Sequence, residues 1–99
     1  MKISILLPYK ENFSPEYPGA VSLFVYETTR ISKFKKFITI FGNTDFKKKF
    51  DLKYININLN KKFFSSQTKN YVNKFITLEK KTKSSIIEVH NRPSYIHLL

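Results

Sequence analysis

The first third of the chain changes its pattern of apolar and polar residues twice. Residues 2–7 are almost all apolar, which is typical of a strand buried on both faces of a parallel sheet. Residues 8–19 contain three prolines and end in Pro18-Gly19, which indicates a loop because both residue types interrupt regular structure. From Ala20 a helical period begins, and we expect a helix that ends within residues 32–35. The positions expected to pack are Val21, Phe24, Val25, Thr28 and Ser32.

The rest of the chain alternates in the same way. The pattern predicts a strand over 37–41 closed by the turn Gly42-Asn43, and then a polar connection over 44–53. A weaker strand over 54–57 and a loop over 58–64 follow. The last two elements are a helix over 66–82 and a strand over 85–89. The second helix has one apolar face, and lysines near its end suit the helix dipole. Ser94 is a candidate cap for a further helix in the tail.

The resulting order, β-α-β-β-α-β, predicts an α/β fold with a Rossmann-like, mostly parallel sheet and flanking helices. Parallel strands need crossover connections, and helices between strands supply them. Residues 1–99 correspond to one domain by length. The alternating pattern looks unfinished, so we expect a partial domain.

Cysteine is absent from the chain, which excludes a disulfide framework and a thiolate metal site. The apolar run over 3–7 is too short for a signal sequence or a membrane span, and Pro8 ends it. We therefore expect a cytoplasmic protein.

The net charge of +11 invites a nucleic-acid interpretation. Lysine outnumbers arginine sixteen to two, however, and nucleic-acid recognition favours the planar guanidinium. Lys, Asn, Ile, Phe and Tyr are over-used together, as an A+T-rich genome would dictate. On this interpretation many of the lysines simply form a solvated surface. A third interpretation of the charge, besides nucleic-acid binding and codon bias, is a weak attraction to anionic membranes.

Candidate ligand-binding residues follow the strands, because ligands bind off the carboxyl ends of an open parallel sheet. Both glycines of the chain lie there, Gly19 before the first helix and Gly42, with Asn43, after the second strand. Glycine at a helix entry allows close approach of an anion or sugar, but Pro18-Gly19 is equally readable as a simple turn. No dinucleotide fingerprint is present.

The fourth strand is followed by His90, Asn91, Arg92 and Pro93. His90 is a candidate catalytic residue, although a histidine bonded to backbone at a strand end is the plainer interpretation. Arg92 is suited to a phosphate or carboxylate, or to a surface acid. Glu11 is placed to contact an acceptor hydroxyl or is simply solvated. Paired carboxylates, a metal cluster, a P-loop and a Ser-His-Asp group are not evident.

Two segments of the chain resemble family 4 glycosyltransferases of the GT-B fold. The opening, Met1 to Pro8 followed by a long loop to Pro18-Gly19-Ala20-Val21 and a helix, is similar to the family's first strand, glycine-rich loop and helix. The segment 86–93, Ile-Ile-Glu-Val-His-Asn-Arg-Pro, resembles the family's strand that ends in histidine. Two positions depart from the family pattern. Ala20 replaces the usual second glycine, and Phe24 or a neighbour replaces a basic residue or histidine in the first helix.

The resemblance implies a retaining transferase that moves a sugar from a nucleotide-sugar donor to a glycan or lipid-linked acceptor without a bound metal. The chain would be the N-terminal, acceptor-side half-domain, inactive alone, and the C-terminal domain with the donor-binding residues is absent from it. Gly19 and Ala20 would lie near the reacting sugar or donor phosphate, and His90 would face the cleft. The alternatives are a free-standing basic α/β module that binds nucleic acid or anionic membrane, and a non-functional remnant with an exposed apolar sheet edge.

Overall fold

The computed structural model describes residues 1–44, 47–59 and 67–90. Its elements are β1 (Ile3–Leu6), α1 (Ala20–Arg30), a 3₁₀ turn (Lys35–Phe37), β2 (Ile38–Gly42), β3 (Tyr54–Asn56), α2 (Gln67–Thr82) and β4 (Ile86–Val89). The strands form one sheet in the order β3-β2-β1-β4, and every neighbouring pair is parallel. The prediction of an α/β fold with the element order β-α-β-β-α-β is confirmed.

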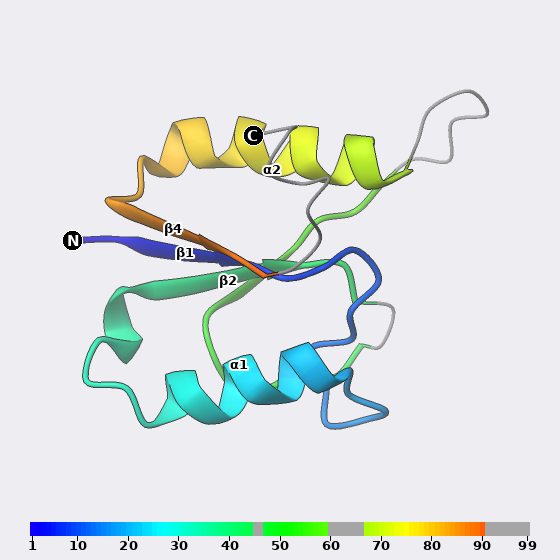
Figure 1. The fold of residues 1–99 in the computed structure, drawn as a ribbon, viewed down its shortest axis with the longest axis vertical. Helices are drawn as coiled ribbons and strands as arrows, with labels where there is room; N and C mark the ends of the chain where they lie inside the picture. The colour runs from blue at the N-terminus through cyan, green and yellow to red at the C-terminus, as the bar shows by residue number, and fades with distance from the viewer. Residues whose placement is uncertain (45–46, 60–66, 91–99) are drawn as a thin grey trace.

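The sheet is the middle of three layers, with α2 against one face and α1 against the other (Figure 1). Successive residues of β1 point to opposite faces, so Leu6 joins the core under α2 and Ile5 joins the core over α1. Phe75 of α2 packs edge-on against Phe41 of β2, with ring centroids 5.1 Å apart. The apolar face predicted for the second helix is confirmed. Neither helix of the described chain is long and apolar enough to cross a membrane.

The packing face predicted for the first helix is correct at Val21 and Val25, which pack in or against the core, and wrong at Phe24 and Thr28, which are exposed. The fully buried positions of α1 are Ser22, Val25 and Thr29, whereas Phe24 is 59% exposed. Two small side chains let α1 lie close to the sheet, and Tyr26 turns inward to stack on Phe50 with a centroid distance of 4.0 Å. Helix α1 thus directs Tyr26, rather than Phe24, toward the aromatic residues that pack on this side of the sheet.

Three predicted boundaries also move. Helix α1 ends at Arg30 rather than within 32–35, and a 3₁₀ turn takes Phe37 out of the second strand. Strand β3 contains three residues and pairs only with β2, which limits its length. The expected tail helix lies outside the described residues.

A buried carboxylate closes the crossover from α2 to β4. Glu79 is 9% exposed; it accepts hydrogen bonds from the Ser4 hydroxyl at 2.9 Å and from the backbone N–H of Ser84 at 2.8 Å. Lys83, between helix and strand, adopts a positive φ of 53° and donates its N–H to the Glu79 carbonyl. These bonds fix where β4 enters the sheet beside β1.

The fourth strand is only partly covered. Strand β4 forms the outer edge of the described sheet, and Ile86 and Ile87, on opposite faces, are 50% and 46% exposed. A hollow of about 570 Å³ lies beside Ile87 on the α2 face, and one of about 300 Å³ lies beside Ile86 on the α1 face. An apolar edge strand of this kind is a template for pairing with another chain.

Where copies of the protein associate through the edge of β4, we expect Ile87→Lys to weaken that association severalfold, because a charge at an exposed sheet edge opposes strand pairing. Sedimentation velocity over a concentration series measures this effect. The matched control is Ile55→Lys on β3, the other edge strand, where the side chain is 38% exposed. Equal effects of the two substitutions would show that β4 is not the associating edge.

Candidate functional site

The carboxyl ends of the four parallel strands meet at one edge of the molecule, together with the start of α1 (Figure 1). The backbone N–H of His90 donates to the Leu6 carbonyl at 3.0 Å, so His90 extends the pairing of β4 with β1. The loop 8–19 leaves β1 at this edge and enters α1 at Gly19. The structure therefore places Gly19, Gly42 and His90 along the same edge.

The close-approach position at Gly19 is filled by the chain's own carboxylate. A Cβ atom added at Gly19 would fall 1.3 Å from Oε2 of Glu11. The same oxygen accepts a hydrogen bond of 3.3 Å from the N–H of Ser22, in the first turn of α1. Glu11 thus supplies the negative charge that a helix N-terminus favours, and Gly19 is required because that carboxylate lies against it. Ala20 beside it is exposed.

The space beside Gly42 is also filled by side chains of the protein itself. A Cβ there would lie 2.8 Å from the Tyr54 hydroxyl and 3.2 Å from Leu7. Burial raises the pKa of Tyr54 to about 12, and its phenol donates to Oδ1 of Asn56 at 2.8 Å. Thr44 lies 2.7 Å from the same hydroxyl and accepts from the N–H of Phe13 at 3.0 Å. This network ties the ends of β2 and β3 to the first loop.

Asn43 also joins the segments that follow β2 and β3. Its amide donates to the carbonyl of Ile57 at 2.8 Å, which holds the chain just after β3 against the turn after β2. The side-chain donor is thereby engaged within the protein.

The loop 8–19 is held by an aromatic cluster formed by Phe13, Tyr26, Phe50 and Tyr54. Phe13 is fully buried; its ring stacks on Tyr54 at 5.1 Å and meets Phe50 edge-on at 5.0 Å. Two non-glycine residues of the loop, Lys10 and Tyr17, have positive φ angles of 64° and 49°. Such conformations cost about 1 kcal/mol or more each, and the buried cluster offsets that cost.

His90 forms a side-chain hydrogen bond with a carboxylate at this edge. Its Nε2 lies 2.8 Å from Oε2 of Glu88, two residues earlier on β4. Alternate residues of a strand share a face, and both side chains lie on the face covered by α1. The ring of Phe24 meets the imidazole edge-on at 6.4 Å. His90 is about one fifth exposed and Glu88 about half, so the pair is open to solvent.

Sequence reasoning missed two members of this group. Glu88 escaped notice although the i, i+2 spacing to His90 on a strand was a usable signal. Phe24 was assigned to the core, so its position beside His90 was not foreseen. Asn91 and Arg92, two further candidates, lie outside the described residues. A carboxylate on one imidazole nitrogen sets the tautomer and leaves the other nitrogen for a ligand hydroxyl.

The buried Ser22 hydroxyl has no hydrogen-bond partner among the described residues. It lies in the first turn of α1, next to the N–H that Glu11 accepts from. Groups of three or more His, Asp or Glu side chains able to hold a metal ion do not occur in the described chain. Comparison with protein-family models found no match, and comparisons with curated proteins and with solved structures found none either.

We expect Gly19→Ala to destabilise the protein by about 1 kcal/mol, because the new methyl group expels the Glu11 carboxylate from the helix N-terminus. Urea unfolding measures the loss. In a Glu11→Ala background the same glycine substitution should cost only a few tenths of a kcal/mol. An unchanged cost in that background would show that Glu11 is not the reason for the glycine.

The Ser22→Ala substitution is expected to raise the free energy of unfolding by about 1 kcal/mol, because it removes a buried hydroxyl that lacks a partner. The control is Ser4→Ala, which should lower it by about 1–3 kcal/mol, since that hydroxyl donates to the buried Glu79 carboxylate. Chemical denaturation of both variants distinguishes them. Destabilisation by Ser22→Ala would mean that its hydroxyl is bonded in solution.

Proposed function

We propose that this chain is the acceptor-side, Rossmann-like part of a GT-B glycosyltransferase. The observation that carries the proposal is the pairing of His90 with Glu88 beside Phe24, at the edge where the first loop enters α1. Ligands of open α/β sheets bind at this edge. His90, the residue proposed to face the cleft, is therefore accompanied by the Glu88 carboxylate, which orients its imidazole.

The chemistry of this group suits a sugar hydroxyl. The Glu88 carboxylate, 2.8 Å from Nε2, holds the imidazole in one orientation. The remaining ring nitrogen is then able to bond a hydroxyl of the transferred sugar or of the acceptor. Phe24, 59% exposed, provides an apolar surface for the C–H face of a sugar ring. The aromatic ring occupies the part of α1 where the family pattern has a basic residue or histidine.

Glu11, Gly19 and Asn43 make contacts within the protein, which limits what they can offer a ligand. With the N-terminus of α1 occupied by Glu11, this unit is better suited to an uncharged acceptor than to a donor phosphate. The nucleotide-sugar donor would bind a second domain, and no bound metal is needed. This part alone would not catalyse transfer.

The open edge of β4 supports a sheet that continues in the parent enzyme. Ile86 and Ile87 are about half exposed where a parallel strand is usually covered on both faces. A further strand beside β4 would bury them and fill the hollows on either face. The protein would work in the cytoplasm, with contact to the inner face of the membrane.

A free-standing basic module is the second candidate. Lys33, Lys35, Lys36 and Lys53 gather around one hollow, which favours it. Lys80 and Lys81 belong to α2, in the opposite layer, so the lysines do not form one continuous nucleic-acid face. We therefore prefer the transferase.

The test is the coding sequence downstream of the Leu99 codon, followed by assay of the gene product it encodes. The proposal expects a second α/β domain with two glutamates eight positions apart, and sugar transfer from a panel of UDP- and GDP-sugars. In that protein His90→Ala should lower kcat/KM roughly 100-fold or more, because a transition-state hydrogen bond is lost.

The control is Thr77→Ala on α2, where the exposed hydroxyl bonds only the Asn73 carbonyl among the described residues. It should leave the kinetics unchanged. Glu88→Gln should lower the rate less than His90→Ala, because the amide oxygen can still hold the imidazole in place. A gene product with neither nucleotide-sugar binding nor transfer would overturn the proposal.

A further inference from the structure

The segment between α1 and β2, residues 31–37, carries exposed apolar side chains on a well-ordered backbone. The N–H groups of Ser32, Lys35 and Phe37 donate to the carbonyls three residues earlier, at 3.0, 3.2 and 2.8 Å. The Ser32 hydroxyl accepts from the N–H of Phe34 at 3.1 Å. These consecutive turns fix the course of the backbone through the segment.

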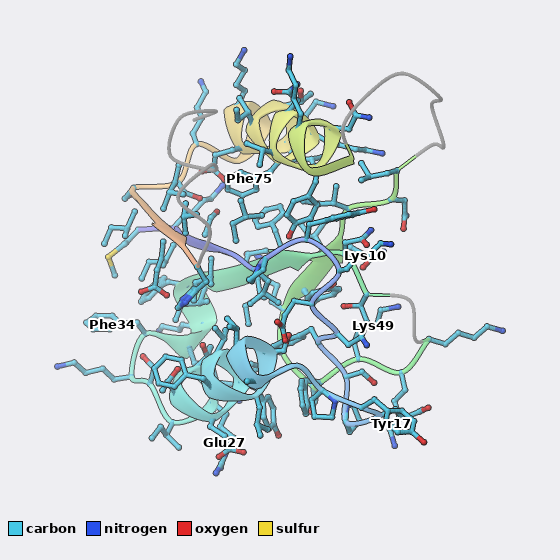
Figure 2. The ribbon with its side chains drawn as sticks, turned by 45° about the vertical axis from the view of Figure 1, so that its right-hand side comes forward. Lys10, Tyr17, Glu27, Phe34, Lys49 and Phe75 are labelled. Carbon is cyan, nitrogen blue, oxygen red and sulfur yellow. The ribbon has the colours of Figure 1, made fainter. Side chains whose placement is uncertain are left out.

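Two of the side chains are apolar and face solvent. Ile31 is 75% exposed and Phe34 is 42% exposed. Figure 2 shows the Phe34 ring projecting away from the body of the molecule, on the side opposite Tyr17. Neither side chain joins the two core clusters. Phe34 lines the hollow of about 300 Å³ beside Ile86 on the α1 face, and a large part of its ring still faces solvent.

Four lysines surround a hollow of about 420 Å³ next to this segment, and Nζ of Lys33 lies 5.4 Å from the centroid of the Phe34 ring. Lys33, Lys35 and Lys36 come from the segment, and Lys53 comes from the residue before β3. Ile38 and Leu52 contribute apolar surface to the hollow. Among the described residues these lysines form no ion pair, whereas the nearby Arg30 is paired with Glu27 at 2.8 Å. The patch therefore keeps its full positive charge.

We propose that this patch, formed by Ile31, Lys33, Phe34, Lys35, Lys36 and Lys53, docks the protein on an anionic phospholipid bilayer. Lysines bind lipid phosphates as point charges, while the apolar pair enters the boundary between headgroups and acyl chains. The lysine stems add apolar contact. Nucleic acid fits less well, because it offers no partner for the aliphatic Ile31 and is recognised preferentially by arginine.

The patch lies at the amino ends of β2 and β3, and His90 lies at the carboxyl end of β4. Docking through the patch would leave the carboxyl edge free to bind a ligand. The proposal does not depend on the transferase activity and stands if the protein has another function.

The experiment measures binding of the full chain to vesicles of phosphatidylcholine with 25 mol% phosphatidylglycerol, and to vesicles of phosphatidylcholine alone. We expect binding to the anionic vesicles only, weakening as salt is raised. Replacing Lys33, Lys35 and Lys36 by glutamine should weaken it roughly 100-fold, since each lysine near the surface contributes about fivefold.

The matched control replaces Lys80, Lys81 and Lys83 by glutamine, which changes the net charge equally, from +11 to +8. These lysines are exposed at the end of α2 in the opposite layer. Their replacement should weaken binding no more than about tenfold. An equal loss in both triple variants, or no binding to anionic vesicles, would overturn the proposal.

A tryptophan reporter locates the contact, because the chain contains no tryptophan. Fluorescence of Phe34→Trp should shift to the blue on anionic vesicles, and that of Tyr17→Trp should not. The double variant Ile31→Ser, Phe34→Ser should weaken vesicle binding about tenfold or more, while leaving binding to a single-stranded oligonucleotide unchanged. A patch that binds the oligonucleotide more tightly than the vesicles, with no effect of that double variant, would identify nucleic acid as the partner instead.

Discussion

Burial of β1 on both faces is the constraint on which the rest of the structure depends. Strand β1 lies between β2 and β4, with Leu6 directed to one core and Ile5 to the other. A strand of this kind requires a cover on each side, which α1 and α2 supply. The parallel crossovers that bring the two helices to opposite faces also bring all four carboxyl ends to one edge. The position of the candidate site is a consequence of this topology.

The first loop shows how that edge is used. Its buried Phe13 anchors it to the aromatic cluster, and Glu11 closes the N-terminus of α1. The hydroxyl and amide groups after β2 and β3 bond one another and the loop. Most polar groups here therefore stabilise the loop. The pair of His90 and Glu88, with Phe24 beside it, remains accessible to a ligand.

The opposite edge has a different character. The turn that follows α1 exposes Ile31 and Phe34 among lysines that lack acidic partners within the described chain. With the proposed ligand site at the carboxyl edge and the proposed membrane contact at the amino edge, the protein would be able to bind a ligand while attached to a bilayer. The apolar outer strand β4 borders this patch, because Phe34 and Ile86 line the same hollow, and its open edge is suited to a further strand.

The order of strands and helices was determined by the sequence itself, because the apolar period switches clearly between strand and helix. The face of α2 followed for the same reason. Tertiary packing alone decided that Phe24 lies outside, because α1 is rotated so that Val25 packs in the core and Tyr26 stacks on Phe50. It also decided that Gly19 accommodates Glu11 and that β4 is an edge, because these depend on which residues distant in sequence come together. Local pattern specifies elements, whereas the contacts between elements specify which side chains remain for function.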